Sequence, residues 1–165
     1  MAGDRSIEIR WQDPMVLAQR AREMTGVEFI QAIASGELPK APIQETMGFE
    51  IAEAEEGRIV VAALPGERHY NPIGVVHGGF AATVLDTALG ACVHTTLANG
   101  EAYTTLETKF NLVRPITGDT GEVRCEGRIV HRGRRVATTE ADIRDSDGKL
   151  LAHGTSTCMI FEAPG

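Results

Sequence analysis

The sequence contains few cysteines, no excess of basic residues and no apolar run suited to lipid. Its three cysteines, Cys92, Cys125 and Cys158, are odd in number and lie among apolar or alternating residues, so no disulfide framework is expected. The net charge of −7 argues against nucleic acid or an anionic membrane as a partner. The first residues lack the apolar segment of a signal peptide, and the run around Phe80 contains Asp86 and several glycines, which suits a protein interior. We therefore expect a cytoplasmic protein.

Two further absences concern chemistry. The histidines outside the Gly-rich motif described below show no metal-ligand spacing with Cys or Asp, so no metal site is expected; they are His69, His94, His131 and His153. No Gly-x-Ser-x-Gly sequence is present, which removes the serine nucleophile elbow from consideration. We expect neither a metal nor an organic cofactor.

The first 42 residues are predicted to form an arm followed by two short helices. Residues 1–13 are polar apart from an alternation of Ile7, Ile9 and Trp11, which indicates a short strand or a docked arm. A helix is predicted from Pro14, and a second follows the capping-box pattern Thr25 to Glu28 and stops at Gly36. Residues 38–42 read as an extended linker. These helices either pack on the sheet or form a lid over a ligand.

Residues 43–165 are predicted to form the main domain, because no later linker is long enough to separate another. Strands are expected at 46–54, 58–64, 104–113, 121–131, 136–144 and 150–161. In the strand 104–113, alternation places Leu106, Thr108, Phe110 and Leu112 on the inner face. One long helix among about six antiparallel strands, without βα alternation, predicts an α+β fold in which the sheet curls round the helix.

The long helix is predicted to begin at His77-Gly78-Gly79 and to end near residues 98–100. No strong side-chain cap is apparent at its start, so unpaired N–H groups and the positive end of the helix dipole would favour a negatively polarised oxygen. The alternative is that the glycines only permit close packing against a strand. Asp86 is the one charged residue between His69 and Gly100, and we expect it to be buried.

One side of this helix is small and polar. It contains Thr83, Asp86, Thr87, Gly90 and His94, spaced three or four residues apart. A buried carboxylate on this side would either hydrogen-bond a neighbouring segment or act in catalysis, and we favour catalysis.

The spacing of Asn71, the His77-Gly78-Gly79 motif and Asp86, together with Phe110-Asn-Leu-Val-Arg-Pro115, resembles the hotdog-fold acyl-CoA thioesterases. The similarity is to the phenylacetate-pathway (PaaI-like) type of the 4-hydroxybenzoyl-CoA thioesterase superfamily. This resemblance implies a central helix wrapped by an antiparallel sheet, paired subunits and acyl-CoA bound at the subunit interface.

The resemblance also implies roles for individual residues. Asp86 would act as a general base on water or as a nucleophile that forms an anhydride, and these alternatives stay open. Asn71 would orient water or the thioester, although Asn71-Pro72 also suits the start of a turn. Thr105, with Thr104 as its rival, would hold the attacking water. His77 would assist the chemistry or fix the loop through backbone hydrogen bonds.

Geometry adds a requirement that does not depend on the family. Gly78 and Asp86 are eight residues apart, about 12 Å along a helix, whereas an oxyanion donor and a base must both lie near one reacting group. One helix cannot supply both groups to one site. We therefore expect a homodimer, or a dimer of such dimers, in which each subunit gives its helix start to one site and Asp86 to the other.

An acidic protein that binds CoA needs a local cationic cluster, because CoA carries phosphates. The candidates are Arg114, Arg132, Arg134 and Arg135, which lie at predicted strand ends or turns, and the cluster from His131 to Arg135 is the favoured one. Two other functions remain in competition with hydrolysis. One is a hotdog enoyl-CoA hydratase or dehydratase, and the other is a non-catalytic acyl-CoA-binding sensor.

Overall fold

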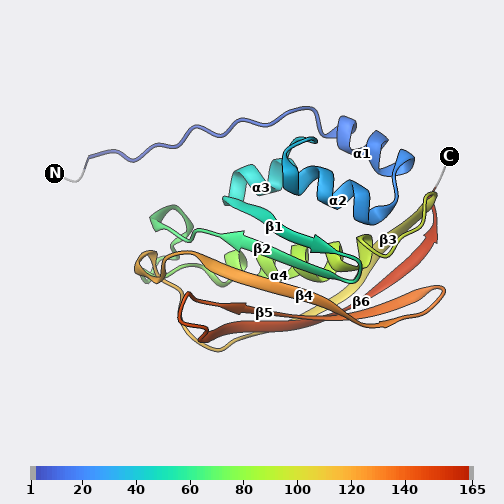
Figure 1. Cartoon of the computed structure of the whole chain (residues 1–165). Helices are drawn as coiled ribbons and strands as arrows, with labels where there is room; N and C mark the ends of the chain where they lie inside the picture. The colour runs from blue at the N-terminus through green and yellow to red at the C-terminus, as the bar shows by residue number, and fades with distance from the viewer. Residues whose placement is uncertain (1–2, 164–165) are drawn as a thin grey trace.

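A 17-residue helix, α4 (Gly78–His94), lies at the centre of the computed structural model, which describes residues 3–163. A six-stranded antiparallel sheet curves round it, with the strand order β1-β2-β4-β5-β6-β3 (Figure 1). The strands are β1 (Phe49–Glu55), β2 (Arg58–Ala63), β3 (Glu101–Leu112), β4 (Val123–Arg132), β5 (Val136–Arg144) and β6 (Leu150–Glu162). The structure confirms the expected α+β class and the wrapped central helix.

The core forms where the apolar sides of α4 meet the inner face of the sheet. Val84, Leu85, Ala88, Leu89 and Cys92 are fully buried there. The helix passes so close to β4 that a Cβ atom added at Gly127 would lie 2.4 Å from the carbonyl oxygen of Ala88. Within residues 3–163, no helix is both long and apolar enough to span a membrane.

The N-terminal helices begin as their sequences indicate. In α1 (Pro14–Glu23), the Asp13 side chain accepts a hydrogen bond of 2.9 Å from the backbone N–H of Met15. In α2 (Gly26–Ser35), Glu28 accepts from the backbone N–H of Thr25 at 3.0 Å, and Gly36 ends the helix at φ 80°. Both predicted helices are confirmed.

The α2 helix packs against β1 and α4 rather than standing apart from the domain. Figure 1 shows α1 to α3 gathered near the β1 edge of the sheet. The buried residues of α2 join the same apolar cluster as α4, and they include Phe29, Ile30 and Ile33. Packing on the sheet therefore describes α2 better than a lid does.

Two expected strands in the N-terminal region differ from the structure, one in its start and one, the alternative to a docked arm, by its absence. The strand expected from residue 46 begins at Phe49, because α3 (Pro42–Met47) occupies the preceding residues and ends at Gly48 with φ 71°. Pro42 at its first turn and the Gln44 side chain, which accepts from the Ala41 N–H at 2.9 Å, favour this short helix. Residues 3–13 form no strand, and their contacts include an ion pair of 2.7 Å between Arg5 and Glu67.

The central helix is shorter than predicted, since α4 ends at His94 rather than near residues 98–100. The hydroxyl groups of Thr95 and Thr96 donate to the carbonyl oxygens of Cys92 and Val93, at 2.7 and 2.8 Å. These side chains satisfy carbonyls that would otherwise accept from a further helical turn.

A β-bulge in β3 changes which side chains face the helix. The register against β6 shifts between Thr105 and Glu107, and the intervening Leu106 is 58% exposed. The expectation that Leu106 faces inward was therefore wrong. Thr105 and Thr108 pair with Cys158 and Ser156, which are buried on the inner face, so the bulge turns both threonines toward the same side.

Candidate active site

His77 caps the start of α4, contrary to the expectation that no strong side-chain cap is present. Its backbone is extended, and its Nδ1 accepts from the N–H of Gly79 at 2.8 Å. The N–H of Phe80 donates to the carbonyl oxygen of His77 at 2.9 Å. Among the described residues, the N–H of Gly78 has no hydrogen-bond acceptor. The cap thus leaves one backbone donor free at the positive end of the helix.

Gly78 lines a cavity of about 300 Å³ with mostly apolar walls. The lining residues are Asn71, Val75, Val76, His77, Gly78, Ala81, Leu112, Val113, Arg114, Pro115 and Ile116. Leu112 lies against the helix start, because a Cβ atom at Gly78 would be 2.7 Å from its Cδ1 atom. A hydrogen bond from Gly78 to a ligand oxygen would be strengthened by these apolar surroundings.

The loop before α4 is held by Asn71, which sequence reasoning placed either in the site or in a turn. Its Oδ1 accepts from the N–H groups of Ile73 and Val75, at 3.0 and 3.3 Å, and its own N–H donates to Val75 at 2.8 Å. Asn71 therefore organises the turn, and it also lines the cavity at Gly78.

His69 contacts both the loop before α4 and the first turn of that helix. Its carbonyl oxygen accepts from the N–H of His77 at 2.8 Å, and its ring lies against Phe80 with a centroid distance of 4.5 Å. Burial, followed by the charge of Arg68, lowers the pKa of His69 and favours the neutral ring. Its Nδ1 accepts from the Gly66 N–H at 3.1 Å.

Asp86 is exposed in the single chain, so the expectation of a buried carboxylate was wrong. It lies on the polar side of α4, and the strands cover the opposite, apolar sides. The hydroxyl of Thr108 donates to its Oδ1 at 3.1 Å. Asp86 does not line the cavity at Gly78. One chain therefore does not bring the predicted oxyanion donor and carboxylate together.

The hydroxyl groups of Thr104, Thr105 and Thr108 on β3 have different surroundings. The Oγ1 of Thr105 lies 3.9 Å from the Sγ of Cys158, whereas Thr104 pairs with Met159 in the opposite orientation. Thr108, which contacts Asp86, was not among the predicted site residues. The one sequence signal that could have identified Thr108 as a site residue was its predicted position on the inner face of the strand.

The four candidate arginines do not form one cluster in one chain. Arg114 lines the cavity at Gly78, and its guanidinium donates to the carbonyl oxygen of Leu150. Arg132 forms an ion pair of 2.8 Å with Glu101. Glu101 is the first residue of β3 and Leu112 is its last. Arg132, which pairs with Glu101, and Arg114, which follows Leu112, therefore lie at opposite ends of the strand.

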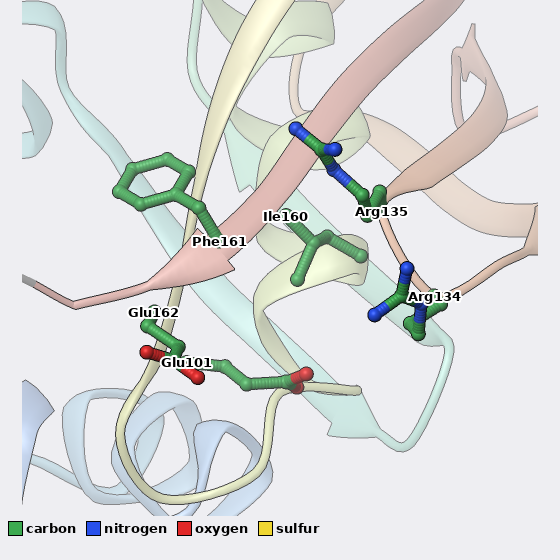
Figure 2. Close-up of a pocket in the computed structure, with 6 residues that line it drawn as sticks. All are labelled: Glu101, Arg134, Arg135, Ile160, Phe161 and Glu162. Carbon is green, nitrogen blue, oxygen red and sulfur yellow. The ribbon is translucent and has the colours of Figure 1, made fainter.

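Arg134 and Arg135 line a second cavity, of about 540 Å³, with Glu101, Ile160, Phe161 and Glu162. Figure 2 shows the two arginines on one side of this cavity and the two glutamates on the other. Both arginines are exposed. The acidic residues across the cavity make it a site of mixed charge rather than a simple anion site.

Other reactive side chains are poorly placed for chemistry. The three cysteines are buried, and burial raises the pKa of Cys92 to about 12, which keeps its thiol protonated. In residues 3–163, no three His, Cys, Asp or Glu side chains are grouped so that they could hold a metal ion.

Comparison with known proteins adds to this geometry. Residues 73–152 match the family model described as the thioesterase superfamily. The 1,4-dihydroxy-2-naphthoyl-CoA hydrolase of Listeria monocytogenes is 29% identical over 118 residues, covering 72% of this chain and 93% of that protein. The phenylacetic acid degradation-related protein of Ralstonia eutropha JMP134 is 30% identical with a TM-score of 0.71, covering 79% of this chain and 98% of that one.

The same architecture occurs in a Streptococcus mutans protein whose structure contains acetyl-CoA. It is 23% identical with a TM-score of 0.64, and the match covers 71% of this chain and 91% of that chain. These likenesses, with the six-stranded order and the wrapped helix, identify the hotdog fold.

Proposed function

This chain belongs to the thioesterase superfamily and is a thioester hydrolase, and on that premise we propose that it hydrolyses an acyl-CoA to the free acid and CoA. The observation that carries the proposal is the free N–H of Gly78, the first residue of α4, which lines a cavity with mostly apolar walls. The Listeria relative is by name a hydrolase of a CoA thioester, and the Streptococcus neighbour binds acetyl-CoA on the same fold.

In this proposal the thioester carbonyl oxygen accepts a hydrogen bond from Gly78, and the helix dipole stabilises the negative charge that develops on it. Asp86 either takes a proton from the attacking water and passes it to the departing thiolate, or attacks the carbonyl carbon itself to form an anhydride that water then hydrolyses. A carbon–oxygen bond forms, the carbon–sulfur bond breaks, and CoA leaves as a thiol after taking up a proton. His77 positions the donor by capping the helix, and Asn71 shapes the loop beside it.

The site requires two copies of the chain, because the helix places Gly78 and Asp86 about 12 Å apart. Asp86 is exposed, and β3 forms an edge of the sheet next to it. Leu106, Phe110 and Leu112 on this strand are 58%, 41% and 55% exposed. An edge strand with exposed apolar side chains favours pairing with a second chain. A homodimer, alone or within a dimer of dimers, would bring the Asp86 of one chain to the Gly78 of the other.

We assign phosphate binding first to Arg114, because it lines the cavity that contains Gly78. The exposed Arg134 and Arg135 are the next candidates, at the other end of β3. Arg132 is less suited, since Glu101 already neutralises it. Double substitution of Arg134 and Arg135 by Ala should raise KM less than Arg114→Ala does, and the reverse order would contradict this assignment.

The test is steady-state release of CoA from aromatic, short-chain and medium-chain acyl-CoAs, measured with a thiol reagent. We expect Asp86→Asn to lower kcat at least about a hundredfold while thermal unfolding stays unchanged. Undiminished hydrolysis by the folded variant would overturn the role of Asp86, and absence of CoA release by the parent protein would overturn the proposed activity. Interconversion of enoyl-CoA and 3-hydroxyacyl-CoA without thiol release would indicate a hydratase, and tight binding without turnover would indicate a sensor.

A further inference from the structure

We propose that Thr108 is a positioning residue that orients Asp86 for hydrolysis. This inference rests on the proposed function, because it assigns Thr108 a task only if Asp86 reacts. It begins with the bulge at Leu106, which places Thr108 on the inner face of β3 opposite the buried Ser156. From there the Thr108 hydroxyl reaches the polar side of α4 and donates to Asp86 Oδ1 at 3.1 Å. Bulges beside active sites commonly redirect a side chain in this way.

The hydrogen bonds around Thr108 favour donation to the carboxylate. The Thr108 hydroxyl is also 3.4 Å from the Oγ of Ser156, but it has one proton and can donate to only one of them. The proton of Ser156 is directed to the carbonyl oxygen of Glu107 at 2.7 Å. The bond to Asp86 is shorter and ends on a charged acceptor, so it is the stronger of the two.

This bond restrains an otherwise free side chain. Asp86 is exposed on the helix, and among the described residues its one side-chain hydrogen bond is the bond from Thr108. With Oδ1 held, the other carboxylate oxygen stays available to water or to the thioester carbon. Catalysis depends on such orientation, because small misplacements of a reacting group cost large factors in rate.

The test compares Thr108→Val, which removes the hydroxyl but keeps a β-branched side chain, with Thr108→Ser, which keeps the hydroxyl. We expect Thr108→Val to lower kcat about tenfold or more with little change in KM, and Thr108→Ser to stay within about threefold of the parent. Thr155→Val is the matched control, since Thr155 is exposed and lies on the outer face of the adjacent β6.

A second background separates this inference from the proposed function. Thr108→Val is also measured on the residual activity of Asp86→Asn, where the substitution should have no further effect. An equal loss in both backgrounds, or an unchanged kcat in the parent background, would overturn the positioning role. Full activity of Asp86→Asn alone would instead reject the catalytic role of Asp86, and absence of CoA release by the parent protein would reject the proposed function. If Thr108→Val unfolds, Thr108→Ala in the same two backgrounds gives the same comparison.

Discussion

The proposal that two chains share each active site can be tested by mixing two inactive variants, one altered at Asp86 and the other at Gly78. Asp86→Ala removes the carboxylate, and Gly78→Pro removes the free N–H. Gly78 is the first residue of α4, where proline is well tolerated, and His77 before it has the extended backbone (ψ 138°) that proline requires. The added ring atoms meet the end of the Leu112 side chain, which can rotate away. We therefore expect Gly78→Pro to fold.

The size of the recovery follows from the geometry. Each single variant should retain about 1% of the parent activity or less, because an oxyanion donor or a catalytic base is lost. With equal mixing and free exchange, half of the dimers carry one copy of each variant. Such a dimer has one site with both defects and one intact site, so about a quarter of all sites recover. The mixture should thus be about 25-fold more active than either variant alone.

The assay is CoA release before and after incubation of the two variants, with subunit exchange followed through two different affinity tags. Gly78→Ala is the control, since it adds a Cβ atom against Leu112 but keeps the N–H. It should retain at least about ten times the activity of Gly78→Pro. Absence of recovery despite demonstrated exchange would refute the reasoning that the helix start and Asp86 serve one site across two chains.

Three further outcomes follow from the packing and from the pKa shifts. Gly127→Ala should lower the free energy of unfolding by about 3 kcal/mol in urea, because its Cβ atom would meet the Ala88 carbonyl oxygen, whereas Gly66→Ala, which meets no atom, should be nearly neutral. Burial lowers the pKa of His94 to about 4, so the neutral form is favoured in the folded state. The free energy of unfolding should therefore be highest above pH 6.5 and should fall by roughly 3 kcal/mol as the pH drops from 6.5 to 4. The variant His94→Phe should lack this loss. The three buried cysteines should react with a thiol reagent only after denaturation, and rapid labelling of the native protein would contradict their burial.

Much of the fold could be predicted because its signals are local. Asp13 and the Thr25 to Glu28 box start helices, and Gly36 ends one, through contacts made within a few residues. The alternation that places Val123 and Cys125 inside is likewise a property of one strand, and both are fully buried. The motif from Asn71 to Gly78 could also be located, because its members line one cavity and belong to one continuous loop and helix start.

The remaining features depend on segments far apart in the chain. The bulge at Leu106 arises from the register between β3 and β6, which the residues of β3 do not reveal, and it turns Thr105 to the same side as Thr108. The contact of Thr108 with Asp86 likewise depends on how β3 and α4 pack together. The exposure of Asp86 depends on which sides of α4 the strands cover, so the apolar residues around it in the sequence misled the burial prediction. The separation of Arg114 from Arg134 follows from the length of β3. The sequence by itself determined the helix, the strands and the reactive groups, because short-range spacing controls them; the tertiary structure decided which groups meet, because that depends on long-range pairing and on how the chain curves.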